Sequence, residues 1–144
     1  MSEENVELVT RLQPGPEVDI AELVRDDKGA EAGWAAAGSV FHDDFDCVVV
    51  GRGSRLTFRG LDGLRAAWLD WLDPWDSYYA VIEDVIDLGE RVLVLSRDHG
   101  HRRDLAADVE QRGASVYTVR DGKVARLEHY TNRDHALEAV GLRE

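Results

Sequence analysis

Four strand-like segments fill most of the second half of this chain, and short turns join them. The segments run over 77–88, 91–101, 108–120 and 123–132. Asp121-Gly122 stands between the last two, and this dipeptide between two strands is typical of a two-residue hairpin turn. Gly89-Glu90 predicts a second hairpin by the same reasoning. A mostly antiparallel sheet therefore constrains every other part of the fold.

The first half of the chain is mainly helical by its hydrophobic spacing. Helices are predicted around 2–12, 20–24, 30–40, 60–73 and 136–140, and short strands around 45–49 and 56–58. Pro14 and Pro74 end two of these helices, since proline lacks the N–H that a helix needs. Helices that come first, followed by a helix embedded in a mostly antiparallel sheet, predict an α+β fold.

The length of 144 residues fits one domain over 1–144, since domains average about 150 residues. No apolar run approaches the roughly 18 residues that a membrane helix needs, and the acidic start at Glu3 and Glu4 differs from a basic secretory signal. A single cysteine excludes an internal disulfide and favours a reducing, cytoplasmic location. The net charge of −12 repels phosphate, so neither nucleic acid nor an anionic membrane surface is an expected partner.

The turn at Asp121-Gly122 predicts which side chains of the last two strands face the helices. A regular hairpin pairs Val116 with Leu127, Ala114 with His129, and Arg112 with Thr131. We expect this set to face inward. Tyr117, Arg126 and Glu128 then lie on the other face of the sheet.

The turn at Gly89-Glu90 predicts a second set of neighbours. It pairs Ile86 with Leu93 and Asp84 with Leu95, and further along Ile82 with Arg97 and Ala80 with His99. This face carries the larger aliphatic side chains, so we expect it to face the core. Arg97 and His99 would then point inward beyond the apolar layer. A slip of one residue would reverse each of these assignments.

Sequence motifs for nucleotide binding, for an α/β-hydrolase serine and for a zinc protease are all missing. His99-Gly100-His101 places two imidazoles on one strand, and His129 could join them at a metal. Spacing fixes no third ligand, so the prediction is that neither a metal nor a cofactor is bound. Cys47 lies in an apolar alternation and is interpreted as a buried, inert thiol.

Tryptophan is concentrated on one predicted helix, at Trp68, Trp71 and Trp75. Such a stripe mainly belongs to a hydrophobic core. Beside strands that end in Arg and His, it also suits an apolar pocket with a few polar groups, which is how small-molecule sites are usually built.

Five segments together resemble the SnoaL-like branch of the nuclear transport factor 2-like superfamily. They are 4–9 (ENVELV), 58–65 (FRGLDGLR), 85–92 (VIDLGERV), 118–124 (TVRDGKV) and 134–142 (DHALEAVGL). The resemblance implies a cone-shaped α+β barrel, in which a curved sheet wraps around helices and encloses a pocket. It also implies a homodimer through the convex face of the sheet, where Tyr117, Arg126 and Glu128 are expected.

The superfamily hosts isomerases, polyketide cyclases, epoxide hydrolases, dehydratases and non-enzymatic binders, so the fold alone implies no single activity. Ketosteroid isomerases place an oxyanion-binding tyrosine on the first helix, and this chain has no tyrosine between Ser2 and Gln13. Steroid isomerase chemistry is therefore not expected.

Two functions remain open for the predicted pocket. The first is general acid/base catalysis on a small, largely apolar carbonyl compound, as in an isomerase, cyclase or hydrolase. His99 and His129 would carry protons, and Arg97 or Arg112 would stabilise an oxyanion. The ligand-binding residues would be Cys47, Trp68, Leu72, Asp84, Arg112, Val116 and Leu127. The alternative is a non-catalytic binder of a small ligand, or a dimeric interaction module.

Overall fold

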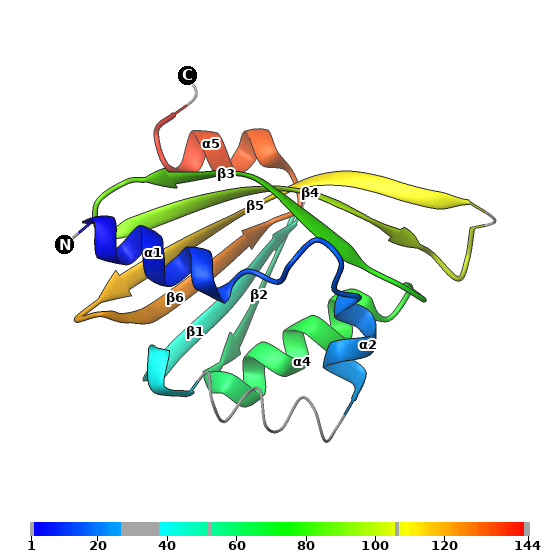
Figure 1. Ribbon diagram of the computed structural model, residues 1–144, viewed down its shortest axis with the longest axis horizontal. Coiled ribbons are helices and arrows are strands. Elements are labelled where there is room, and N and C mark those ends of the chain that lie inside the picture. Colours follow the sequence, from blue (N-terminus) through cyan, green and yellow to red (C-terminus); the bar gives the residue numbers. More distant parts are fainter. Residues whose placement is uncertain (1, 27–37, 52, 106, 143–144) are drawn as a thin grey trace.

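Six strands form one curved sheet in a computed structural model that describes residues 2–26, 38–51, 53–105 and 107–142 (Figure 1). The strands are β1 (Phe41–Gly51), β2 (Ser54–Arg59), β3 (Tyr79–Asp87), β4 (Arg91–His101), β5 (Asp108–Arg120) and β6 (Lys123–Tyr130). Their order across the sheet is β2-β1-β6-β5-β4-β3. Every neighbouring pair is antiparallel except β1 and β6, which run parallel. The α+β fold with a mostly antiparallel sheet is thus confirmed.

The helices, with the labels of Figure 1, are α1 (Ser2–Leu12), α2 (Ile20–Arg25), α4 (Gly60–Leu72) and α5 (Arg133–Ala139). A short 3-10 helix, η1 (Gly38–Val40), precedes β1. The helix predicted over 30–40 falls mostly outside the described residues, which resume at Gly38. Among the residues that the structure describes, no helix has the length and hydrophobicity to span a membrane.

Both faces of the sheet are covered by helices. Figure 1 shows α1, α2 and α4 on one side of the curved sheet and α5 on the other. On the first, concave side, Val9 of α1 and Leu64 of α4 pack in one cluster with Val94 of β4. On the convex side, Ala136 of α5 packs in a separate cluster with Leu93 of β4. Alternate residues of one strand therefore enter two different hydrophobic cores.

The two predicted hairpin turns are confirmed. Arg120 pairs with Lys123, and Asp121 and Gly122 both have positive φ angles, of 54° and 74°, as a type I′ turn requires. At the other turn, Ile86 pairs with Leu93 and Asp84 with Leu95, as predicted.

Beyond each turn, a bulge shifts the register by one residue. In β6, Val124 pairs with Val119 but Arg126 pairs with Thr118, so Ala125 has no opposite residue. In β3, Asp84 pairs with Leu95 but Ile82 pairs with Ser96, so Glu83 is the extra residue. A bulge places two residues opposite one, and this changes which residues share a face.

The bulges make several predicted pairings wrong. Val116 faces Glu128 rather than Leu127, and Ala114 faces Tyr130 rather than His129. Ile82 faces Ser96 rather than Arg97, and Ala80 faces Asp98 rather than His99. On the concave side, the paired residues are therefore Ser115 with His129, Tyr117 with Leu127, Ala80 with Asp98, and Ile82 with Ser96.

Candidate functional site

A cavity of about 360 Å³ lies between the concave face of the sheet and the helices α1, α2 and α4. Its size is at the lower end of the range for small-molecule sites. Most of its wall is apolar. The lining residues include Leu12, Ile20, Val24, Phe41, Val49, Leu64, Ala67, Trp68, Trp71, Ala80, Ile82 and Val94.

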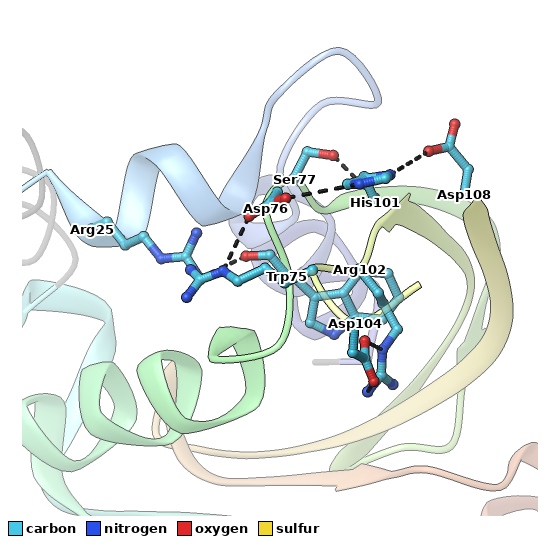
Figure 2. Close-up of polar contacts among 9 residues, drawn as sticks. Arg25, Trp75, Asp76, Ser77, His101, Arg102, Asp104 and Asp108 are labelled. Atoms are coloured by element: carbon cyan, nitrogen blue, oxygen red, sulfur yellow. Dashed lines mark hydrogen bonds and ion pairs between the residues drawn. The ribbon is translucent and has the colours of Figure 1, made fainter. Parts of the chain in front are cut away.

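Helix α2 is anchored across this cavity by hydrogen bonds at both of its ends. Asp19 caps the helix at the amide of Ala21, and its carboxylate also accepts from the amide of Tyr78 at 3.1 Å. At the other end, Arg25 donates to the carbonyl of Leu72 at 2.6 Å. It also donates to the carbonyl of Trp75 at 2.7 Å (Figure 2). The helix has only six residues, so these tertiary contacts stabilise it more than its own hydrogen bonds do.

Five polar residues of the cavity wall lie together, and we call them the polar end: Tyr78, Ser96, Asp98, Ser115 and His129. Gly113 of β5 shows how close three of them lie. A Cβ atom on Gly113 would stand 3.3 Å from Cε1 of His129 and 3.4 Å from both Asp98 Oδ2 and Ser96 Oγ. The absence of a side chain at this position keeps the polar end open.

Asp98 is the charged group of the polar end, and only 4% of its surface is exposed. The Tyr78 hydroxyl donates to its Oδ2 at 2.5 Å. Its other oxygen, Oδ1, is buried and has no hydrogen-bond partner among the described residues. A buried carboxylate oxygen without a donor is energetically costly, which is why such groups concentrate at functional sites.

Tyr78 supports Asp98 and is itself held by its neighbours. Its pKa is raised far above the usual range by burial, and then by the nearby Asp98 carboxylate. The hydroxyl therefore stays protonated and acts as a hydrogen-bond donor. Gln111 donates to the Tyr78 oxygen at 3.5 Å, and the Tyr78 ring lies edge-to-face against Trp75.

His129 is fixed by two contacts. Its Nδ1 lies 2.9 Å from the Ser115 hydroxyl, and its ring lies edge-to-face against Trp71 with centroids 4.9 Å apart. Burial lowers the pKa of His129, while the Asp98 carboxylate acts in the opposite direction. The imidazole is therefore neutral near pH 7 and can accept a proton.

Two further functional groups line the cavity away from the polar end. The Tyr117 hydroxyl accepts a hydrogen bond from Gln13 at 3.1 Å, and burial raises its pKa. Burial also raises the pKa of the Cys47 thiol to about 11. A thiol with this pKa carries almost no thiolate at neutral pH, so it is a poor nucleophile.

Four of the predicted site residues line the cavity: Cys47, Trp68, Leu127 and His129. Leu127 and His129 were placed inward from the turn at Asp121-Gly122, whereas Cys47 and Trp68 were selected from the apolar pattern of their segments. Tyr117 also lines the cavity, which corrects the prediction that it lies on the convex face. The bulge at Ala125 explains the difference, because it pairs Tyr117 with Leu127.

Arg97 and His99 do not line the cavity, and their predicted inward orientation is wrong. They alternate along β4 with Ser96 and Asp98, which do line it. His99 instead stacks on Tyr79 with ring centroids 5.3 Å apart, and Arg97 lies 3.9 Å from Glu110. The large aliphatic residues of β4 suggested the wrong face because they pack beneath α5.

The other four predicted ligand-binding residues also lie outside the cavity lining. Leu72 is buried behind it with Trp75 and Tyr78, and Val116 is buried in the cluster beneath α5. Asp84 and Arg112 are exposed to solvent. Asp84 accepts a hydrogen bond from the Val85 amide.

His101 is held in a surface network rather than in a metal site (Figure 2). Its two ring nitrogens lie 3.8 Å from Asp76 and 3.4 Å from Asp108. Arg103 also pairs with Asp76, at 3.0 Å. Among the described residues, no group of three or more His, Cys, Asp and Glu side chains is placed to hold a metal ion.

Sequence reasoning missed Asp98, Tyr78 and Ser115 as site residues. One signal was present in the chain. Val92, Val94, Ser96 and Asp98 alternate along β4, and a carboxylate at the end of such a buried row is unusual.

The SnoaL-like domain model matches residues 18–127. A protein from Jannaschia sp. CCS1, proposed to be a SnoaL-like polyketide cyclase, is 19% identical over 99% of this chain and 95% of its own, with a TM-score of 0.69. An NTF2-like protein from Burkholderia xenovorans LB400 is 22% identical, with 97% of each chain covered and a TM-score of 0.61.

An NTF2-like protein of unknown function from Burkholderia pseudomallei K96243 is 13% identical over 95% of this chain and 97% of its own, with a TM-score of 0.62. No curated protein sequence matches this chain. At these identities, the similarity between the solved structures and this chain shows a shared fold and nothing about activity.

Proposed function

This chain belongs to the SnoaL-like domain family, and we propose that it is an enzyme that moves a proton on a small, largely apolar carbonyl compound held in its cavity. The observation that carries the proposal is the placement of His129 beside Asp98 at the polar end. A neutral imidazole next to a buried carboxylate is a suitable general base, because the carboxylate stabilises the imidazolium that forms.

Each residue of the polar end has a distinct part in the proposed reaction. In the proposed reaction, the Nδ1–H of His129 donates a hydrogen bond to the Ser115 hydroxyl oxygen. The unprotonated Nε2 then takes the proton from the carbon next to the carbonyl group. The electron pair of the broken C–H bond moves to the carbonyl oxygen and gives an enolate. Return of the proton from His129 to carbon completes the reaction, in the same place or at a conjugated position. Asp98 and Tyr78 are positioning residues that stabilise the charged imidazole.

The predicted roles of Arg97 and Arg112 have no support, since neither residue lines the cavity. No Lys or Arg occurs among the described residues of its wall. The enolate oxygen would therefore need a neutral hydrogen-bond donor, and the Ser96 hydroxyl at the polar end is the candidate.

The proposal can be tested by hydrogen exchange at carbon. We would incubate the protein with 2-tetralone in D₂O and follow the loss of the α-hydrogen signals by NMR. The wild type should exceed the buffer rate, and His129→Gln should lower the catalysed rate by about 10² to 10⁴, the usual contribution of a general base. His99→Gln is the matched control, because His99 stacks on Tyr79 outside the cavity.

The alternative function is a non-catalytic binder of a small ligand. It is favoured by one observation: Tyr78 with Asp98, and Ser115 with His129, already satisfy part of each other's hydrogen bonding. Saturable binding of 2-tetralone without exchange above the buffer rate would support the binder and contradict the enzyme.

We also propose the homodimer through the convex face, now with Arg126 and Glu128 but without Tyr117. Glu128 lies 3.7 Å from Arg126 and 3.9 Å from Arg55, so this part of the face is a row of ion pairs beside α5. Sedimentation should give twice the chain mass of 16.1 kDa, and Arg126→Glu should reduce it to one chain. A wild-type mass of 16.1 kDa at micromolar concentration would contradict the dimer.

A further inference from the structure

We propose that the cavity selects a cationic ligand, an apolar amine whose ammonium group pairs with Asp98 and lies among the rings of Trp71 and Tyr78. The proposal shares the cavity with the proposed function and names the ligand class, but it does not depend on catalysis. It rests on the charge of the wall, on the unpartnered oxygen of Asp98 and on the aromatic residues around it.

The described wall of the cavity carries one negative charge and no positive one. Asp98 is its single acidic residue, and none of its described members is Lys or Arg. His129 does not offset this charge, because burial favours its neutral form. An anionic ligand would therefore be repelled at the polar end, whereas a cation would be attracted.

Asp98 lines the cavity and has an unused acceptor. Its Oδ2 accepts from Tyr78, whereas Oδ1 is buried without a partner among the described residues. A buried carboxylate is destabilising unless it is paired and hydrogen-bonded. An ammonium group offers both a positive charge and three donors, so it would satisfy Oδ1 in a way that a neutral alcohol cannot match.

Aromatic rings surround this carboxylate. Trp71 packs against His129, and Trp68 lies edge-to-face against Tyr78 with centroids 6.4 Å apart. Ring faces of Trp and Tyr attract cations, more strongly when water is excluded. The outer side of Trp75 already holds such a cation, Arg102, at 5.6 Å (Figure 2). In the part of the chain that the structure describes, no Lys or Arg side chain lies over the ring of Trp68 or Trp71, which both line the cavity.

The whole molecule favours the same ligand class at longer range. Its 29 acidic and 17 basic residues give a net charge of −12. Such a field raises the local concentration of cations and speeds their encounter with the protein. This effect is not specific to the cavity, so a test must separate it from pairing with Asp98.

A series of three ligands of similar size and different charge provides that test. We would measure the binding of 3-phenylpropylamine, 3-phenyl-1-propanol and 3-phenylpropanoate by calorimetry at pH 7 in 0.15 M NaCl, where exposed charges are screened beyond about 8 Å. The ammonium should bind about tenfold or more tightly than the alcohol, since a charge-assisted bond replaces a neutral one. The carboxylate should bind most weakly.

Asp98→Asn should remove the preference for the ammonium and leave the affinity for the alcohol nearly unchanged. Asp84→Asn, an equal change of charge at an exposed carboxylate, should leave the preference intact. Tyr78→Phe keeps the Asp98 charge and should keep the preference, so loss of the preference in this variant would overturn the pairing with Asp98. If Asp98→Asn fails to fold, the three-ligand series on the wild type still tests the proposal.

Equal affinities for the ammonium and the alcohol would overturn the proposal. So would a preference that survives in Asp98→Asn, tighter binding of the carboxylate, or no binding of any of the three ligands. None of these results depends on exchange of 2-tetralone, so failure of this proposal and failure of the proposed catalysis are separate outcomes.

Discussion

At the scale of single residues, the hydrogen bond from Tyr78 to Asp98 joins the site to the stability of the fold. Both groups are buried, and the bond links the residue that precedes β3 to β4. Tyr78→Phe removes the donor and leaves the carboxylate without this partner. We expect the free energy of unfolding to fall by about 1–3 kcal/mol, the usual effect of leaving a buried polar group unsatisfied.

Urea unfolding of the variant and the wild type measures this change. Tyr79→Phe is the matched control, since it removes a hydroxyl from the adjacent residue, whose ring stacks on His99. It should change the free energy of unfolding by less than half as much. Equal losses in the two variants would show that the Tyr78 hydroxyl contributes nothing specific.

His129 predicts how stability depends on pH. Its pKa in the folded protein lies below the ordinary value of 6.5 that it takes when unfolded. The unfolded chain therefore binds a proton more readily, and the folded state loses stability as the pH falls below about 6.5. The slope from this residue can reach about 1.4 kcal/mol per pH unit.

The measurement is urea unfolding between pH 8 and pH 5. His129→Gln should give a flatter profile in this range than the wild type, because glutamine does not titrate. His99→Gln should retain the wild-type slope. A wild-type slope in His129→Gln would mean that other groups produce the pH dependence.

At the scale of elements, the bulges determine which side chains reach the cavity. The extra residue Ala125 shifts the pairing of β6 with β5 by one residue, so that Leu127 and His129 lie opposite Tyr117 and Ser115 on the concave side. The extra residue Glu83 shifts the pairing of β3 with β4 in the same way. The Glu83 carboxylate also accepts a 2.6 Å hydrogen bond from Arg133 at the start of α5. The hydrogen bond from Arg133 lowers the pKa of Glu83.

Deletion of Ala125 tests the role of its bulge. Without the extra residue, Val124 and Arg126 become consecutive in a regular hairpin, and Leu127 and His129 keep their partners Tyr117 and Ser115. We expect the free energy of unfolding to change by less than about 2 kcal/mol, because buried and polar side chains keep their faces. Circular dichroism and urea unfolding would measure it.

Ala125→Gly is the control for this deletion, because it keeps the residue count and removes only one methyl group. Its effect should be about 1 kcal/mol or less. A deletion that lowers the free energy of unfolding by more than about 3 kcal/mol, while Ala125→Gly costs little, would mean that the fold requires the bulge itself.

These bulges explain what could be predicted from the sequence and what could not. The element order, the α+β class and both turns follow from periodicity and from Asp121-Gly122, whose φ angles are set by local chemistry. The sequence pattern did not predict which face of β4 and which face of β5 lies toward the cavity. Ala125 and Glu83 are ordinary strand residues with no local signal for a bulge, and a one-residue shift exchanges the two faces.

The same ambiguity hid Asp98. If one face of the sheet were exposed to solvent, the large apolar residues Leu93 and Leu95 would have shown which face of β4 packs against the core. Here α5 buries Leu93 on the convex side, so apolar residues occur on both faces of β4. The inward orientation of His129 was predicted correctly because β6 is polar on its other face, at Arg126 and Glu128.

At the scale of the whole molecule, the net charge of −12 opposes the compact state. Like charges repel one another across the folded surface, and added salt screens them. We expect the melting temperature to rise by a few degrees between about 20 mM and 0.5 M NaCl, as less than about 1 kcal/mol of stabilisation would produce in a chain of this size. Scanning calorimetry or thermal circular dichroism measures this directly.

Ion pairs work in the opposite direction, and the sign of the salt effect shows which contribution is larger. The pair of Arg133 with Glu83 and the pair of Arg103 with Asp76 would both be weakened by salt. Exposed pairs contribute little each, so repulsion among the excess carboxylates should dominate and the melting temperature should rise. A fall in the melting temperature would mean that the ion-pair networks outweigh the repulsion, and equal results in NaCl and KCl would exclude binding of a specific cation.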